Sequence, residues 1–137
     1  MTASRPLAWD DPAHAPWHRI ALDRDVRWSD LSGSLAVDAR NSADQTPLMA
    51  ACRTRNTPLV RDLLQAGADP NATNRTGTTP LMFAKTVALA SGDFAVMDLL
   101  IAAGADPAAR DVHGLRARDY VEARSEAISA YLKAAGG

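Results

Sequence analysis

Apolar residues recur at helical spacing in two segments of the chain that are similar to each other. The positions that share this spacing are Leu59, Val60, Leu63 and Leu64 in one segment and Val96, Met97, Leu100 and Ile101 in the other. A glycine follows each segment, Gly67 or Gly104, and accepts the left-handed backbone conformation that ends many helices. The pattern therefore predicts two amphipathic helices with the same stop signal.

A helix start lies upstream of each of these helices. Thr46 and Thr79 each precede a proline and a run of small apolar residues, and this order favours a helix start because the hydroxyl caps the backbone and proline fits the first turn. The two threonines are 33 residues apart, whereas the two glycines are 37 residues apart. The second copy thus carries four additional residues, within residues 86–92, which predicts a first helix that continues to about Ala90.

The order of elements resembles the ankyrin repeat. It consists of a helix, a turn, a second helix, a glycine stop and a polar turn, repeated about every 33 residues. The residues that carry the resemblance are Thr46, Pro47, Leu48, Gly67, Ala68, Asp69 and Asn71 in one copy and Gly77, Thr79, Pro80, Leu81, Gly92, Asp93, Phe94, Gly104, Ala105 and Asp106 in the other. The resemblance covers residues 34–133 and implies an all-α fold, an ankyrin-repeat solenoid of helix-turn-helix units with projecting turns. About three repeats are expected, at residues 38–70, 71–107 and 108–135.

Residues 1–30 are not ankyrin-like, although residues 23–33 also suit the closing half of a degenerate N-terminal repeat. Residues 1–33 are expected to form a separate N-terminal segment that caps the repeat domain at residues 34–137. This segment holds all three tryptophans, Trp9, Trp17 and Trp28, whose rings supply apolar area for a lid over the first repeat. We favour that interpretation over a ligand site.

Five residues depart from the pattern that the resemblance implies. Met49 and Met82 stand where a histidine commonly bridges adjacent repeats, and Arg55 stands where a glycine usually separates the two helices. Asp62 falls between inward-facing residues of its helix, and Arg118 occupies the position of a buried leucine. Without the histidine bridges, apolar packing must connect the repeats, so we expect modest stability.

Composition narrows the function classes. The chain has 137 residues, of which 47% are hydrophobic and 23% charged, and its net charge is −1. These values suit one globular domain and predict no nucleic-acid partner, because a basic excess is missing. No apolar run approaches the ~18 residues that span a membrane. One cysteine excludes an internal disulfide, and no secretory leader is visible, so we expect a cytoplasmic protein that is monomeric when free.

The sequence carries no motif for catalysis. It has neither a nucleophile elbow nor a glycine-rich phosphate loop, so we expect no enzyme activity and no cofactor. Cys52 falls among the small residues of a first helix, which favours a buried packing role. His14, His18 and His113 lack the spacing of metal ligands, and Pro16 argues against a helix that brings the first two together. We therefore expect no metal site.

The resemblance implies a protein partner that lies across the turn tips and the concave face of the first helices. The expected turn-tip residues are Ser42, Ala43, Gln45, Arg75, Thr76, Thr78, Val112, His113 and Leu115. The expected first-helix residues are Met49, Arg53, Thr54, Met82 and Lys85, with Asp119 in the C-terminal cap. Arg53, Arg75 and Lys85 make this face locally basic, which favours a partner with an acidic surface.

Two function classes stay open at this point. The first is a protein-binding module that inhibits or scaffolds its partner; an immunity or antitoxin role, known from small bacterial ankyrin proteins, is its narrowest form. The second is a small-molecule or enzyme accessory protein that uses the Trp- and His-rich N-terminal segment. The four additional residues are either a tolerated insertion or a mark of the binding face.

Overall fold

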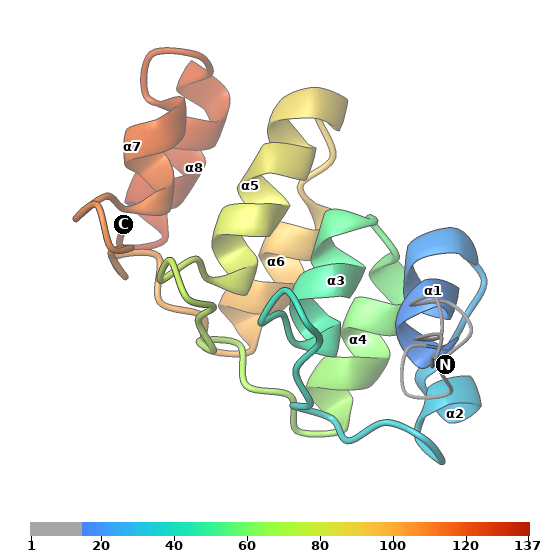
Figure 1. Ribbon diagram of the computed structural model, residues 1–137. Helices are drawn as coiled ribbons and strands as arrows, with labels where there is room; N and C mark the ends of the chain where they lie inside the picture. The colour runs from blue at the N-terminus through green and yellow to red at the C-terminus, as the bar shows by residue number, and fades with distance from the viewer. Residues whose placement is uncertain (1–14) are drawn as a thin grey trace.

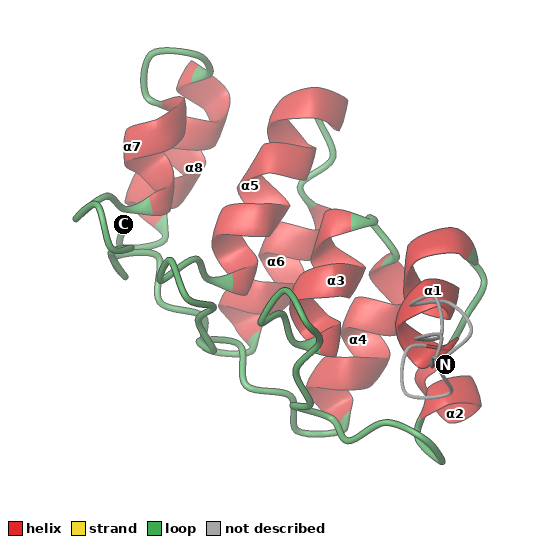
Figure 2. Cartoon of the chain, viewed as in Figure 1, coloured by secondary structure: helices red, strands yellow, loops and turns green. Residues whose placement is uncertain are grey.

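The computed structural model describes residues 15–137, and this part of the chain consists of eight α-helices joined by loops, without a strand (Figures 1 and 2). The helices are α1 (Ala15–Leu22), α2 (Trp28–Leu31), α3 (Pro47–Arg53), α4 (Thr57–Gln65), α5 (Pro80–Ser91), α6 (Ala95–Ala102), α7 (Ala117–Val121) and α8 (Glu126–Ala134). The all-α solenoid inferred from the sequence is confirmed.

The helices stack as successive pairs. α3, α5 and α7 pack side by side as the first helices of their units, while α4 packs against α6 in the second layer. The long loops that precede α3, α5 and α7 project along one edge of the stack (Figure 1). The loops and the first helices therefore share a face that the second helices do not reach.

The helix starts follow from the threonines and prolines of the sequence. The Thr46 hydroxyl accepts a hydrogen bond from the Met49 N–H at 3.3 Å, and Thr79 does the same for Met82 at 3.3 Å. A proline opens both helices, at the position where its missing N–H costs nothing. Asn56 caps α4 through the Leu59 N–H at 3.2 Å.

The core fills the space between the two layers. Leu48, Leu59, Leu63, Leu81 and Leu100 are fully buried, and burial of each such side chain contributes about 2 kcal/mol. The small residues that allow the helices to approach closely are Ala50, Ala51, Cys52, Ala84 and Ala88. The buried packing role expected for Cys52 is confirmed, since its side chain is completely enclosed and burial raises the pKa of the thiol.

The second repeat is longer than the first, as predicted. α5 has 12 residues against 7 in α3, and Gly92 ends it with a φ of 74°. The turn after α3 is closed instead by Arg55, whose φ of 58° lies in the left-handed region. A left-handed backbone conformation costs a residue with a side chain about 1 kcal/mol of stability relative to glycine. This cost explains why the family pattern has a glycine at this position.

The described part of the N-terminal segment covers the first repeat. α1 packs against α3 and α2 against α4, and the rings of Trp17 and Trp28 pack against the core. Pro16 does not prevent a helix over residues 15–22: it lies in the first turn of α1, where the N–H that proline lacks would have no partner within the helix. Whether a helix brings His14 and His18 together stays a prediction. Trp9 and His14 lie outside the described residues. The boundary between a cap at residues 1–33 and a repeat domain at 34–137 stays a prediction.

Candidate protein-binding face

Three projecting loops are built by the same arrangement. In each, a side-chain oxygen accepts hydrogen bonds from the backbone N–H groups two and four residues later, which closes a tight turn. The residues that do so are Asn41, Asn74 and Asp111, with N–O distances between 2.9 and 3.1 Å. The three loop tips therefore have the same local geometry, one repeat after another.

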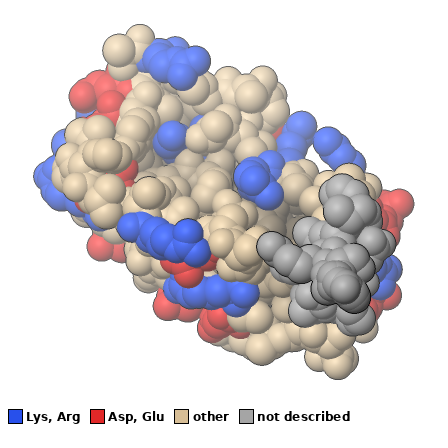
Figure 3. Space-filling view, viewed as in Figure 1, with Lys and Arg blue, Asp and Glu red and all other residues tan. Residues whose placement is uncertain are grey.

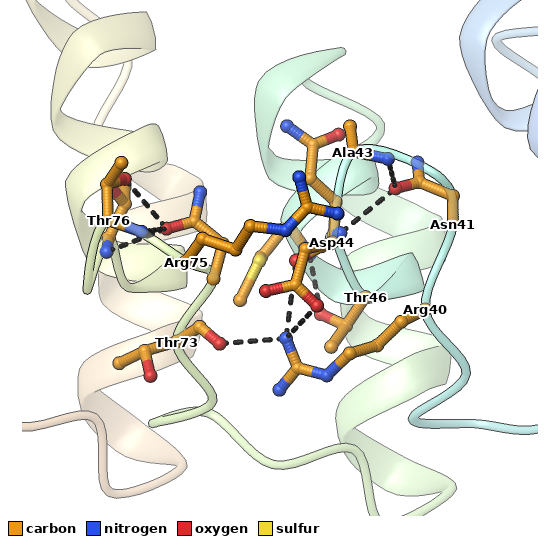
Figure 4. Close-up of polar contacts among 12 residues, drawn as sticks. Arg40, Asn41, Ala43, Asp44, Thr46, Thr73, Arg75 and Thr76 are labelled. Atoms are coloured by element: carbon orange, nitrogen blue, oxygen red, sulfur yellow. Dashed lines mark hydrogen bonds and ion pairs between the residues drawn. The ribbon is translucent and has the colours of Figure 1, made fainter.

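Arginine side chains connect the first and second loops (Figure 4). Arg40 Nη1 donates to the backbone carbonyl oxygens of Asp44 at 3.2 Å and Thr73 at 2.8 Å. Arg75 Nη2 donates to the carbonyl oxygen of Ser42 at 3.2 Å. The tips thus form a connected rim, and the Arg75 guanidinium is partly engaged within it.

The backbone connects the second and third loops. The N–H of Val112 donates to the carbonyl oxygen of Thr76 at 2.9 Å. The approach is so close that a Cβ on Gly77 would stand 2.9 Å from the Cα of Asp111. Gly77 also has a φ of 74°, so both its backbone and its surroundings require glycine.

Most of the predicted turn-tip residues are exposed. They are Ser42, Ala43, Arg75, Thr76, Val112, His113 and Leu115. Thr78 is half-buried, as are Thr54 and Lys85 on the first helices, whereas Arg53 is exposed. The loop residues of this set belong to the projecting loops, as expected. The contact of any of these residues with a partner stays a prediction.

The expectation that Gln45, Met49 and Met82 are exposed on this face is wrong. Gln45 is 9% exposed, Met49 0% and Met82 4%. Both methionines lie in the capped first turn of a helix, where an unbranched apolar side chain is stabilised by packing inside the stack. Gln45 precedes the cap residue Thr46, at the point where the loop enters the stack.

Asp119, expected on the concave face of the cap, is engaged within its own helix. Its carboxylate accepts from the Arg116 backbone N–H at 2.7 Å, from Nε at 3.1 Å and from Nη2 at 3.0 Å. These hydrogen bonds lower the pKa of Asp119 to about 2. The carboxylate caps α7 and holds Arg116, so it is not a free charge for a partner.

The expected basic strip is divided. Lys85 Nζ lies 4.6 Å from the centre of the Tyr120 ring and 3.0 Å from the Thr86 hydroxyl, while Arg75 belongs to the loop rim. Arg53 lines a different depression, between α1, α3 and α5. Figure 3 shows Lys and Arg interspersed with Asp and Glu over the loops rather than an unbroken basic surface.

An apolar patch accompanies Lys85 on this face. Within residues 15–137, the large hydrophobic side chains classed as exposed are Leu22, Val112 (62%), Leu115 (37%) and Tyr120 (37%). All but Leu22 belong to the third loop and α7. We define the Tyr120 patch as Phe83, Lys85, Val112, Leu115 and Tyr120. Of these residues, Phe83, Lys85 and Tyr120 line a depression of about 240 Å³ between α5 and α7.

Hydrogen bonds hold the centre of the Tyr120 patch in place. The Tyr120 hydroxyl donates to Asp111 Oδ2, which ties α7 to the loop. This donation, together with the loop N–H groups, lowers the pKa of Asp111, and the carboxylate raises the pKa of Tyr120. Partial burial and the charge of Arg124 lower the pKa of Lys85. The patch therefore presents an aromatic ring, a partly desolvated ammonium group and apolar loop residues.

Sequence reasoning missed Phe83 and Tyr120. Phe83 follows Met82 in α5, and Tyr120 follows Asp119 in α7. When the second and third repeats are aligned, the two aromatic residues therefore fall at the same position. That signal was available in the sequence. The proximity of Asp111 to Tyr120 was less visible, because it depends on how the loop folds back over α7.

The described residues offer no group of His, Cys, Asp and Glu side chains that could bind a metal ion. Within the same range, every helix is too short or too polar to cross a membrane.

Comparison with known proteins agrees with this architecture. A family model described as "Ankyrin repeats (3 copies)" matches residues 28–111. Zygote-specific protein 3 of Chlamydomonas reinhardtii is 38% identical over 92 residues, which are 67% of this chain and 24% of that protein. NF-kappa-B inhibitor delta of Mus musculus is 32% identical over 117 residues, 80% of this chain and 34% of that protein.

A further relative is much longer than this chain. Mitochondrial disaggregase of Bos taurus is 44% identical over 66 residues, which are 48% of this chain and 9% of that protein. The chain thus spans about a third or less of the length of these relatives. The family model, by contrast, matches more than half of this chain, in the region where the helices stack in pairs. The chain belongs to the ankyrin-repeat family.

Proposed function

We propose that this chain binds one protein partner through the Tyr120 patch and the tips of the second and third loops. Ankyrin repeats are protein-protein interaction modules and are typically not enzymes, so the coarse function follows from the family. The observation that carries the finer proposal is that three of the four exposed large hydrophobic side chains within residues 15–137, Val112, Leu115 and Tyr120, belong to the third loop and α7. Exposed apolar side chains that cluster in this way are typical of interaction sites.

The chemistry of the patch indicates the kind of surface that fits it. An aromatic ring and two apolar loop residues supply area for a buried anchor, and aromatic side chains are enriched among residues that dominate binding energy. Lys85 beside the ring and Arg75 on the rim add positive charge at the edge of this area. A partner segment with an apolar side chain flanked by carboxylates complements this arrangement.

We further propose that binding inhibits the partner by covering a functional surface. The name of NF-kappa-B inhibitor delta, which aligns with 80% of this chain, supports inhibition over scaffolding. An immunity or antitoxin role, in which a monomeric chain masks the active site of a cognate effector, is the narrowest form of this proposal. The location in the cytoplasm belongs to the same proposal.

The experiment is a pull-down from an extract of the native cell, followed by identification of the partner and titration calorimetry with purified proteins. A 1:1 complex is expected. Val112→Ser with Tyr120→Ala should weaken it at least tenfold, about 1.4 kcal/mol.

Leu22→Ser provides the matched control, because Leu22 is 81% exposed and lies at the far end of the array in α1. It should leave the affinity unchanged. Loss of binding in Leu22→Ser together with full binding in the double variant would place the partner elsewhere and refute the proposed face.

A further inference from the structure

A basic depression lies where α1, α3 and α5 end. Arg24, Arg53 and Arg55 line it together with Val87, Ala90 and Ser91, and its volume is about 320 Å³. The last three residues come from the part of α5 that the four additional residues lengthen. The insertion therefore builds one wall of a depression that lies apart from the Tyr120 patch.

The charge of this depression is largely uncompensated. Arg55 Nη2 donates to Asp93 Oδ2 at 3.0 Å, but within residues 15–137 neither Arg24 nor Arg53 forms an ion pair. No lining residue is acidic. Counted over the lining residues and Asp93, three guanidinium groups against one carboxylate give a formal charge of +2.

Among the side chains that line this depression, the guanidinium groups are the hydrogen-bond donors available to a ligand. The Thr54 hydroxyl donates to the Ala50 carbonyl oxygen at 3.0 Å, and the Ser91 hydroxyl donates to the Val87 carbonyl oxygen at 2.7 Å. Both hydroxyl protons are thus already used. Arg53 lies in the last turn of α3, where the carbonyl end of the helix favours a cation.

We infer that this depression binds a phosphoryl group carried by a side chain of a protein partner. Guanidinium groups match the oxygens of a phosphoryl group in planar, two-pronged hydrogen bonds. A phosphorylated side chain carries a charge of about −1.5 to −2 at neutral pH, close to the local charge of the depression. Ala21, Val87 and Ala90 also line the depression, and such apolar side chains can pack against the ring of a phosphotyrosine.

The test is an NMR titration of the full chain with a short peptide that contains a central phosphotyrosine, observed at the arginine Nε–Hε signals. Saturable shifts of the Arg24 and Arg53 signals are expected. Parallel titrations use the unphosphorylated peptide, a glutamate peptide and inorganic phosphate. Each should bind at least about tenfold more weakly than the phosphotyrosine peptide.

Two double variants with the same change in net charge separate a built site from general attraction. Arg24→Gln with Arg53→Gln should weaken binding of the phosphotyrosine peptide at least about tenfold. Arg61→Gln with Arg124→Gln, at exposed positions outside the depression, should leave it within about twofold. Thermal unfolding of each variant verifies that it is folded.

Equal losses in both double variants, or an absence of saturable shifts, would overturn the inference. Equal affinity for inorganic phosphate would overturn the assignment to a partner side chain, and equal affinity for the glutamate peptide would overturn the assignment to a phosphoryl group. None of these variants replaces a residue of the Tyr120 patch, and the peptide titrations do not involve the native partner, so the outcome is independent of the proposed function.

Discussion

Arg27 and Asp62, 35 residues apart, form a two-pronged ion pair: Nε donates to Oδ2 and Nη2 to Oδ1, both at 2.7 Å. Asp62 Oδ2 also accepts from the backbone N–H of Trp28 at 3.2 Å, at the start of α2. Asp62, which interrupts the apolar pattern of α4, thus fastens α2 onto α4. The aspartate that departs from the repeat pattern therefore holds the N-terminal cap in place.

This ion pair predicts a dependence of stability on pH. The hydrogen bonds from Arg27 lower the pKa of Asp62 below its ordinary value of 3.8. A carboxyl group whose folded-state pKa is lowered contributes stability above its unfolded-state pKa, and this contribution is lost as the pH falls through the folded-state pKa. Asp62→Asn should therefore lower the midpoint of urea unfolding at pH 7. Below pH 4, the midpoint of this variant should fall less steeply with pH than that of the parent protein.

Asp25→Asn, on the exposed loop between α1 and α2, is the matched control for urea unfolding across pH 2 to 7. It removes one carboxylate without touching Arg27. If both variants follow the same curve, Asp62 does not fasten α2.

The loop contact at Gly77 predicts a difference between two glycines of nearly equal backbone conformation. Gly77 and Gly114 have φ values of 74° and 76°, but an added Cβ meets the Asp111 backbone only at Gly77. Gly114→Ala should cost about 1 kcal/mol of unfolding free energy from backbone strain, and Gly77→Ala about 2–3 kcal/mol. Equal costs in chemical denaturation would show that the loops do not rely on this close approach.

The left-handed backbone at Arg55 predicts a stabilising substitution. Arg55→Gly removes a side chain from a φ of 58° and gives up an exposed ion pair with Asp93, so it should add about 0.5–1 kcal/mol of stability. Asp44→Gly, at a φ of 59°, should add less, because Asp tolerates this region and Asp44 Oδ1 accepts from Arg40. A lower urea midpoint for Arg55→Gly than for the parent contradicts this reading.

Arg118 stands where Leu48 and Leu81 are buried in the preceding repeats, and its Nε is buried without a hydrogen-bond partner among the described residues. Arg118→Leu should stabilise the third repeat by about 1–2 kcal/mol, because it removes an unsatisfied polar group and restores an apolar contact. Arg124→Leu, at an exposed position, is the control and should change stability by less than about 0.5 kcal/mol. A thermal unfolding midpoint that falls in Arg118→Leu would mean that this guanidinium group is satisfied in solution.

The sequence allowed the helices of the two clear repeats to be predicted because each signal was local. Thr46 and Thr79 cap helices three residues ahead, and Gly92 ends the lengthened α5, all within one turn of the residue concerned. The helix at Pro16 was missed because proline was taken as a break, although it also fits a first turn.

The candidate site was only partly predictable, because it depends on contacts between distant residues. The loop tips followed from the repeat, whereas Met49 and Met82 were placed on the surface by analogy and not by their helical face. The ion pair of Arg27 with Asp62 and the convergence of Arg24 on Arg53 arise from helix stacking, which brings together residues about 30 positions apart.

Hydrogen exchange followed by mass spectrometry, with the isolated partner added at saturating concentration, tests whether the partner covers the Tyr120 patch. Binding at this patch predicts protection in peptides that cover residues 74–86 and 111–121, with α4 and α6 unchanged. Protection confined to α4 and α6, with the third loop and α7 exchanging as in the free protein, would contradict it.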